Sequence, residues 1–176
     1  MLDSSILNDK EYMRLIDKYI NNNEVMRLKD IPHHDSNRLN HSLKVSYYSY
    51  KICKKLNLNY ISAAKAGILH DLFFTRSANY NKAKDKIKLY SNAHPEMALE
   101  NAKKVTDLTP LEENIIISHM WPLSKYLPKY KESFILGSVD TVISTKEFAS
   151  KLNYKLTYAL GVYFIFMCYL VFKSNI

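Results

Sequence analysis

The sequence predicts an all-α fold, and three observations support this class. Apolar residues recur at helical spacing through most of the 176 residues, only three glycines are present, and no stretch alternates strongly enough to indicate a sheet. Hydrophobic residues make up 47% of the chain, which argues against disorder. We therefore expect one small helical domain with a sizeable core and a short extension.

The first helices can be placed in chain order. Residues 1–30 are expected to form an N-terminal helical extension, and residues 31–150 the main domain. The apolar positions of the extension at helical spacing are Tyr12, Leu15, Ile16, Tyr19 and Ile20. The first long helix of the main domain should run over residues 36–56 and place His41 close to the core.

Two helices in the middle of the domain are expected to carry histidines near their ends. The first lies near residues 60–73 and holds the adjacent pair His70 and Asp71 at its end. Residues 109–112 form a capping box with proline in the first turn, so the second helix begins there and carries His119 near its end.

The two remaining helices of the domain are expected on either side of this capped helix. Residues 74–93 indicate a polar connection that contains at most one short helix. Pro95 fits the first position of the next helix, so His94 would cap it and face the site. The last helix of the domain is expected at residues 132–148 and bears Asp140.

The C-terminal segment, residues 151–176, contains a long apolar run. Residues 156–172 hold no charge and are bracketed by Lys155 and Lys173. As a helix this run would be about 25 Å long, slightly short of a hydrocarbon core of about 30 Å. Because the run has no polar face, we expect a C-terminal membrane anchor that leaves the domain facing the cytosol; the alternative is a buried final helix or a dimer contact.

Six residues have the side chains and the order of metal ligands. They are His41, His70, Asp71, His94, His119 and Asp140. Imidazole and carboxylate together suit iron, manganese, zinc and other divalent ions, and ligands so far apart in sequence must be brought together inside a fold. Asp140 follows an apolar run, where an unpaired carboxylate is costly unless a cation or hydrogen bonds compensate.

These six residues can coordinate one metal ion or two. If four of them hold a first ion, His94 and His119 remain for a second, and the Asp71 carboxylate can bridge both ions through its two oxygens. The four are then His41, His70, Asp71 and Asp140. Two ions about 3.5–4 Å apart can activate a bridging water and stabilise both the attacking and the leaving oxygen in phosphoryl transfer.

The same motifs carry a family resemblance over about residues 34–145. They are Asn40-His41-Ser42-Leu43-Lys44-Val45, Leu69-His70-Asp71, His94-Pro95-Glu96, His119 and Val139-Asp140. In this order they resemble the HD-domain superfamily of metal-dependent phosphohydrolases, in its binuclear branch. The resemblance implies a helical bundle with the metal site in its core. The implied ligands are His41, His70, Asp71 and Asp140 for the first metal, and Asp71, His94 and His119 for the second.

The resemblance also implies an activity and its cofactors. The expected reaction is hydrolysis of a phosphate ester or anhydride of a nucleotide or similar small metabolite through a metal-bridging hydroxide. Asp71 would be the catalytic residue, and the cofactors would be two divalent ions, iron or manganese, with zinc, magnesium or others as alternatives. The runner-up activity is a di-iron oxygenase on the same ligands. A membrane-attached nucleotide-binding sensor is the alternative outside catalysis.

Two departures narrow the substrate within this resemblance. The Gly-Tyr-Pro element of the HD-GYP cyclic-dinucleotide phosphodiesterases is missing. So is the acidic Glu-Asp pair that follows the motif in guanosine tetraphosphate hydrolases. Both substrates are therefore disfavoured.

Candidate substrate contacts lie next to the first ligand. Arg38 and Lys44 precede and follow His41 by three residues, about one helical turn, so they could present cations to a phosphate at the metals. His34 is a weaker candidate for the same pocket. For each of these residues the alternative is an ordinary surface position.

Charge and cysteine content bound the partners and the compartment. The net charge of +8 comes with only four arginines among 25 basic residues and with scattered lysines, so we do not expect nucleic-acid binding. Cys53 and Cys168 stand in no paired motif, and the N-terminus shows no cleavable signal. A reducing cytoplasm is the simplest setting.

Overall fold

The computed structural model describes residues 4–33, 36–74 and 86–150. In chain order the named elements are α1 (Ser4–Asn8), α2 (Lys10–Ile20), α3 (Asn23–Met26), η1 (Arg27–Asp30), β1 (Pro32–His33), β2 (Ser36–Asn37), α4 (Arg38–Lys55), α5 (Tyr60–Leu69), α6 (Lys86–Val105) and α7 (Pro110–Ser118). A further helix covers residues 131–150. The antiparallel β1–β2 ladder joins only Pro32 to Asn37 and His33 to Ser36. The predicted all-α class is therefore confirmed.

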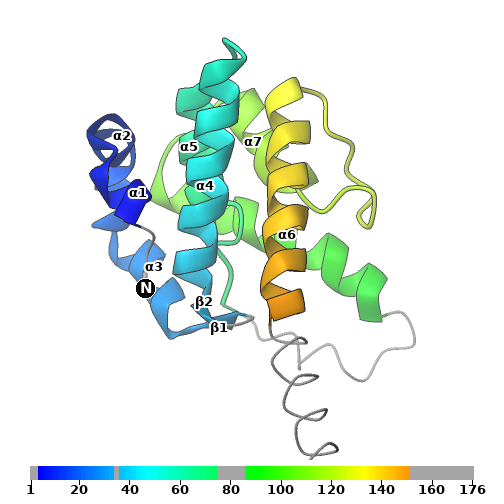
Figure 1. Cartoon of the computed structure of the whole chain (residues 1–176). Helices are drawn as coiled ribbons and strands as arrows, with labels where there is room; N and C mark the ends of the chain where they lie inside the picture. Colours follow the sequence, from blue (N-terminus) through cyan, green and yellow to red (C-terminus); the bar gives the residue numbers. More distant parts are fainter. Residues whose placement is uncertain (1–3, 34–35, 75–85, 151–176) are drawn as a thin grey trace, which may run out of the picture.

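Helix α4 lies at the centre of the bundle. Figure 1 shows it between the N-terminal helices α1–α3 and helix 131–150, with α5 and α7 behind it. Among the labelled elements, its most extensive contact is with α5. Most positions of α4 are buried, in a band wider than a single stripe, and a half-buried or exposed face is formed by Lys44, Tyr48, Lys51 and Lys55. This is the pattern of a helix covered on several sides, and it places His41 inside the bundle.

Tyr12 ties the N-terminal helices to this core. Its ring is fully buried, and its hydroxyl donates to Ser46 Oγ of α4 at 2.9 Å. The Ser46 hydroxyl in turn donates to the carbonyl oxygen of Ala64 in α5 at 2.6 Å. Residues 1–30 were expected as an extension, and the described part of them packs directly onto α4 and α5. The domain boundaries at residues 30 and 150 stay predictions.

A glycine allows α4 and α5 to approach closely. A Cβ atom at Gly67 would lie only 2.5 Å from the Cα of Ser46, where real contacts of this kind essentially never occur. Since the obstacle is backbone, a side chain at this position would have to push the two helices apart. Gly67 lies one turn before His70, so the contact also fixes where α5 ends relative to α4.

We expect Gly67→Ala to destabilise the protein by about 1–3 kcal/mol, because the overpacking exceeds the gain of up to about 1 kcal/mol from replacing glycine in a helix. Urea unfolding of the two proteins measures this difference. Ile61→Ala is the matched control on α5, since Ile61 is 51% exposed and its truncation should change the unfolding free energy by at most about 0.5 kcal/mol. A Gly67→Ala protein as stable as the wild type would show that the close approach has no energetic role.

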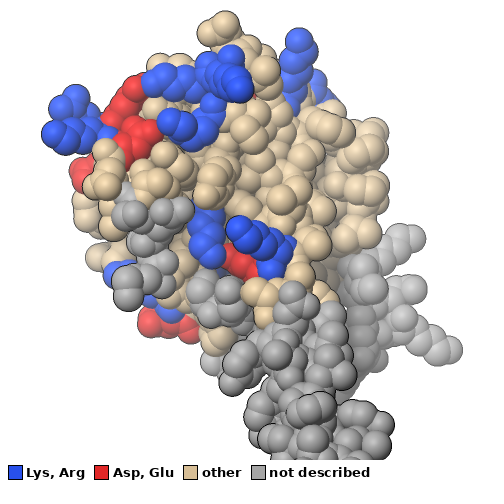
Figure 2. All heavy atoms as spheres, in the orientation of Figure 1, with Lys and Arg blue, Asp and Glu red and all other residues tan. Residues whose placement is uncertain are grey.

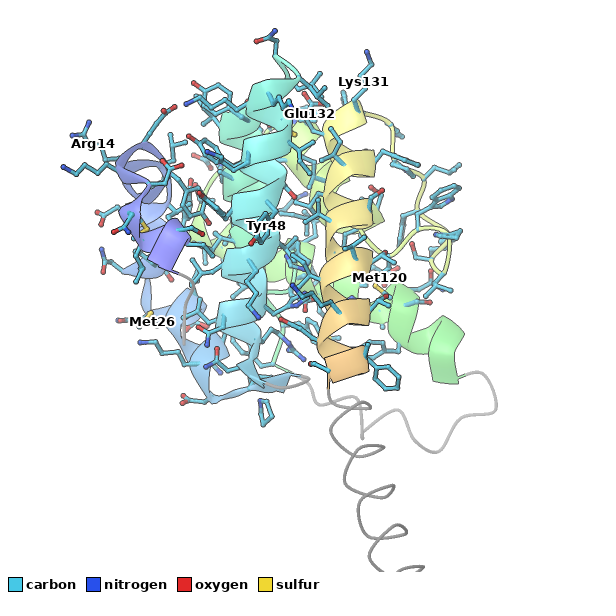
Figure 3. All side chains as sticks on the ribbon, viewed as in Figure 1. Arg14, Met26, Tyr48, Met120, Lys131 and Glu132 are labelled. Atoms are coloured by element: carbon cyan, nitrogen blue, oxygen red, sulfur yellow. The ribbon has the colours of Figure 1, made fainter. Side chains whose placement is uncertain are left out.

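Helix 131–150 lies on the side of α4 opposite to the N-terminal helices and contacts both α5 and α7 (Figure 1). Figure 3 shows Lys131 pointing away from the bundle at the start of this helix, next to Glu132. Glu132 is buried and accepts a hydrogen bond from the backbone N–H of Asn59, the N-cap of α5, at 2.9 Å. Farther along, a Cβ at Gly137 would lie 2.9 Å from the carbonyl oxygen of His119. The helix therefore passes directly over the end of α7.

The predicted start of the helix at Pro95 is wrong. Helix α6 begins at Lys86, and both His94 and Pro95 lie inside it, so His94 is not a cap. The residues that hold this helix against the bundle are spaced four apart on both sides of the proline: Tyr90, His94, Ala98 and Ala102. Burial of this continuous face outweighs the local cost of a proline in a helix. The predicted polar connection is correspondingly too long.

Two further boundaries differ from expectation. Helix α5 ends at Leu69, so His70 is its C-cap and Asp71 lies just beyond it, whereas the sequence predicted a helix to residue 73. The apolar run at residues 156–172 lies outside the described residues. Within the residues that are described, no helix has the length and apolar character needed to cross a membrane.

Candidate metal centre

The six predicted ligands come from separate elements and meet in the core. Their positions are His41 in α4, His70 at the C-cap of α5, Asp71 just after it, His94 in α6, His119 at the C-cap of α7, and Asp140 in helix 131–150. All six side chains are buried. The close helix approaches at Gly67 and Gly137 explain how ligands on different helices come within reach of one another.

Every histidine of the group uses its Nδ1 atom for a hydrogen bond away from the centre. The acceptors are the carbonyl oxygens of Gly67, Tyr90 and Ile116 for His70, His94 and His119, at 2.7, 2.8 and 2.7 Å, and Glu147 Oε2 for His41, at 3.1 Å. A carbonyl or carboxylate oxygen accepts, so the proton resides on Nδ1. In its neutral form, each ring would therefore present the lone pair of Nε2 to the centre, as metal-binding histidines do.

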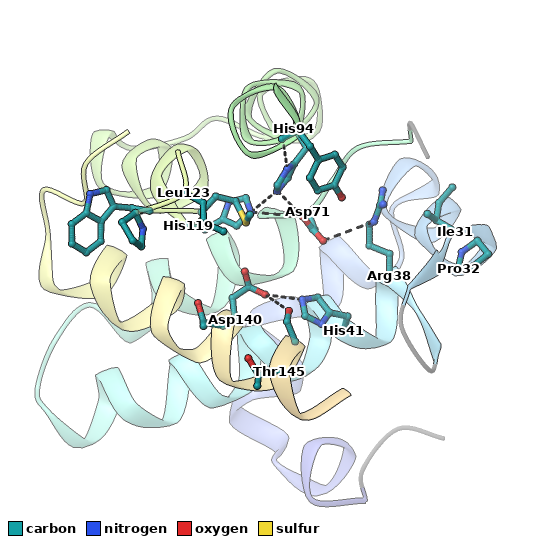
Figure 4. A pocket seen from close by; sticks show the side chains of 16 residues that line it. Ile31, Pro32, Arg38, His41, Asp71, His94, His119, Leu123, Asp140 and Thr145 are labelled. Atoms are coloured by element: carbon teal, nitrogen blue, oxygen red, sulfur yellow. Dashed lines mark hydrogen bonds and ion pairs between the residues drawn. The ribbon is translucent and has the colours of Figure 1, made fainter. Parts of the chain in front are cut away.

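The Nε2 atoms and the two carboxylates converge, and Figure 4 shows this for every ligand except His70, which is not drawn. On one side, Asp140 Oδ1 lies 2.9 Å from His41 Nε2 and 3.8 Å from His70 Nε2. On the other side, Asp71 Oδ1 lies 3.7 Å from His94 Nε2 and 3.8 Å from His119 Nε2. Three groups of three residues have ligand atoms within 4.8 Å of one another: His41, His70 and Asp71; His70, His119 and Asp140; and Asp71, His94 and His119.

Two details of this geometry fit a bound cation. The Nε2 atoms of His94 and His119 lie 3.0 Å apart, although the hydrogen bonds at Nδ1 leave both as acceptors. The Nε2 atom of His70 is buried and has no hydrogen-bond partner among the described residues. Lone pairs in such positions are unfavourable unless a cation lies between them. The residues present therefore suit a divalent metal, while the number of ions stays a prediction.

Charge is distributed unevenly over the two sides of the centre. Burial disfavours the charged form of His41, but hydrogen bonds to the carboxylates of Asp140 and Glu147 outweigh burial and raise the pKa of His41 to about 10. Burial and the neighbouring ring of His119 lower the pKa of His94 to about 4. Burial, followed by the neighbouring ring of His70, also lowers the pKa of His119. At neutral pH, His41 therefore carries a proton on Nε2 that a metal ion would displace. His94 and His119 are neutral and carry no second proton.

This asymmetry predicts different pH dependences for metal binding on the two sides. Below the pKa of His41, an ion at its Nε2 must release a proton, so affinity should rise by up to about tenfold per pH unit between about pH 6 and 9. An ion on His94 and His119 meets rings whose pKa values are both lowered, so the rings are neutral at pH 7 and above, and the ion should bind there with little pH dependence. Calorimetric titration at several pH values, with His41→Ala as the control, separates the two sides. Equal pH dependence on both sides would contradict the prediction.

The ligands open onto a pocket of about 900 Å³. Five of the six line it, and His70 lies behind them with no exposed surface. Apolar and aromatic side chains form the outer walls: Ile31, Pro32, Tyr90, Met120, Trp121, Pro122 and Leu123. Three hydroxyl side chains of helix 131–150 line the floor near Asp140: Thr141, Ser144 and Thr145. A small molecule with a polar and an apolar end fits such a pocket.

Among the described residues that line this pocket, Arg38 is the one arginine or lysine, and it lies beside Asp71. It is only 3% exposed, and its guanidinium stacks on the Phe73 ring with Cζ 3.7 Å from the ring centroid. One terminal nitrogen donates to the Phe73 carbonyl oxygen, and Nε lies 3.8 Å from Asp71 Oδ2. Nε has no hydrogen-bond partner among the described residues. Arg38 therefore lies next to the predicted metal ligands, and its role as a substrate contact stays a prediction.

The other two candidate substrate contacts do not join this pocket in the same way. His34 lies outside the described residues. Lys44 lines a second pocket of about 760 Å³ and places Nζ 2.7 Å from Glu147 Oε1. Glu147 was missed by the sequence analysis, although it lies seven residues after Asp140 and so two turns along the same helix face. The geometry therefore gives Lys44 a protein partner on the far side of His41.

Comparison with known proteins gives one finding. A family model described as HD domain matches residues 38–140. No curated protein and no solved structure matches the chain. The matched range is more than half of the sequence, begins with α4 and ends at Asp140, so it spans all six buried ligands. On this match and this geometry, the chain belongs to the HD-domain family.

Proposed function

We propose that the protein is a metal-dependent phosphohydrolase that uses two divalent ions, iron or manganese, to cleave a phosphate ester or anhydride of a nucleotide or similar small metabolite. The observation that carries this proposal is the convergence of four histidine Nε2 atoms on two carboxylates at the base of an open pocket. Divalent ions bound by these residues would supply an activated water and neutralise charge on the phosphoryl oxygens.

The chain's own residues would orient the substrate. Asp71, His70 and His119 each belong to two of the three ligand groups. Of these, Asp71 has two oxygens that can bind different ions, so it is the candidate for a shared ligand and for the catalytic residue. Arg38, fixed by Phe73, lies within 3.8 Å of Asp71 and can pair with a phosphate oxygen that approaches the centre. The burial of these groups keeps bulk water away and strengthens their interaction with charge that develops on the phosphate.

The pocket walls support a nucleotide-like substrate. Tyr90 and Trp121 offer ring surfaces, and Leu123 and Pro32 add apolar contact at the rim. A phosphate placed at Arg38 and the ligands would leave the rest of a small metabolite against these side chains. Membrane attachment through residues 156–172 and a cytoplasmic location remain part of the proposal.

The test is a substrate screen on protein purified without added metal. Metal content is measured first, and phosphate release is then followed over nucleotides, dinucleotides and simple phosphomonoesters with manganese or iron(II). We expect phosphate release that depends on added metal and is lost with a chelator. Oxygen consumption with no phosphate release would replace this proposal by the di-iron oxygenase. Tight nucleotide binding with neither reaction would favour a sensor.

A further inference from the structure

Glu147 lies directly behind one metal ligand, on the side away from the pocket. Its Oε2 accepts from His41 Nδ1 at 3.1 Å, and its Oε1 accepts from Lys44 Nζ at 2.7 Å. Only 4% of the residue is exposed. A carboxylate in such a position is costly to bury unless both oxygens are paired, and here α4 supplies both partners.

His41 differs from the other three histidines in what holds it. His70 and His119 donate to carbonyls in the last turns of α5 and α7, where no helical N–H competes for them. His94 donates to the carbonyl one turn earlier in its own helix. His41 alone, among the four, donates to a side chain, which is charged and comes from another helix.

This difference has a chemical consequence. A carboxylate holds an imidazole N–H more strongly than a neutral carbonyl does, and it makes the opposite ring nitrogen a better electron donor. The contact also fixes the rotation of the His41 ring from outside α4. Glu147 and Asp140 lie two turns apart on one helix, and both contact His41. A single helix therefore provides one predicted metal ligand, Asp140, and the residue that holds another, His41.

The second partner of Glu147 lies at the surface of the molecule. The Lys44 side chain is 28% exposed and lines the pocket between α4 and helix 131–150, together with Lys146 and Glu147. Figure 2 shows a small cluster of basic and acidic side chains low on this face, below a mostly uncharged surface. Four side chains are therefore connected in series: Lys44 contacts Glu147, Glu147 contacts His41, and His41 contacts Asp140. Lys44 is the member of this series at the second pocket.

We propose that Glu147, held in place by Lys44, is a positioning residue that fixes His41 as an Nε2 ligand and strengthens the metal site on the His41 side. The inference rests on the metal centre of the proposed function and not on the reaction catalysed. It assigns Lys44 to the support of a ligand, on the opposite side of His41 from the substrate pocket.

The experiment is a calorimetric titration of the metal-depleted full chain with manganese(II), on wild type, Glu147→Ala, Glu147→Gln and His41→Ala. We expect Glu147→Ala to weaken one ion by about 10–100-fold and to leave the other unchanged. The weakened ion should be the one that His41→Ala removes. Glu147→Gln retains an acceptor for Nδ1 without the charge, so it should recover part of the lost affinity.

Glu112→Ala is the matched control. Glu112 is also 4% exposed and also pairs with a lysine at 2.7 Å, Lys65 Nζ, but it contacts none of the ligands in any described interaction. It should lower the melting temperature and retain both metal affinities. Glu147 variants that bind both ions like wild type would overturn the inference, and so would an equal loss of both ions. A wild type that binds no metal would instead overturn the proposed function.

Discussion

Replacing Asp71 by alanine should lower kcat by about a thousandfold or more at equal metal loading. The carboxylate faces His94 and His119 through Oδ1 and Arg38 through Oδ2, so its loss disturbs both the ligand set and the cation beside it. About 4 kcal/mol of lost transition-state stabilisation corresponds to this factor. Initial rates of phosphate release, on protein whose metal content has been measured, test the prediction. Activity close to wild type at full metal loading would remove Asp71 from the mechanism.

Arg38 is the comparison for this experiment, because it lies in the same pocket but belongs to none of the ligand groups. If it binds the phosphate equally in the ground and transition states, Arg38→Lys should mainly raise KM, by about tenfold, with kcat nearly retained. The lysine keeps the charge and loses the planar contact with Phe73. A fall in kcat at unchanged KM would instead place Arg38 in the stabilisation of the transition state alone.

Much of this architecture could be predicted because the residue types of the candidate ligands and their order in the sequence identify them. A histidine or aspartate that ends an apolar run, such as His70 or Asp140, is visible from sequence alone since burial of an unpaired polar group is costly. The capping box at Thr109 likewise fixes the start of α7 from local residues. Signals of this kind do not depend on how the helices pack.

The failures occur where packing decides. Pro95 is a strong local signal for a helix start, but the buried face from Tyr90 to Ala102 continues through it. No local signal marks Glu147, because its two partners, His41 and Lys44, are more than 100 positions away in the sequence. Its spacing from Asp140 was the available signal, and it becomes informative only once α4 is known to lie against helix 131–150.

The double substitution His94→Ala, His119→Ala should reduce the metal content from about two ions per chain to about one. In the predicted arrangement these rings hold the ion opposite His41. Their pKa values are lowered, so they are neutral donors at pH 7. The remaining ligands, His41, His70, Asp71 and Asp140, keep their own contacts and should retain one ion. Elemental analysis after dialysis gives the count directly.

The control for this count is Ser118→Ala, since Ser118 is buried beside His119 but donates only to the Asn114 carbonyl oxygen among its described hydrogen bonds. It should retain both ions, and thermal melts of all variants show whether any loss of metal follows unfolding. A wild type with one ion, unchanged by the double substitution, would contradict the binuclear arrangement. That result would also mean that the Nε2 atoms of His94 and His119, 3.0 Å apart, share a proton and not a metal ion.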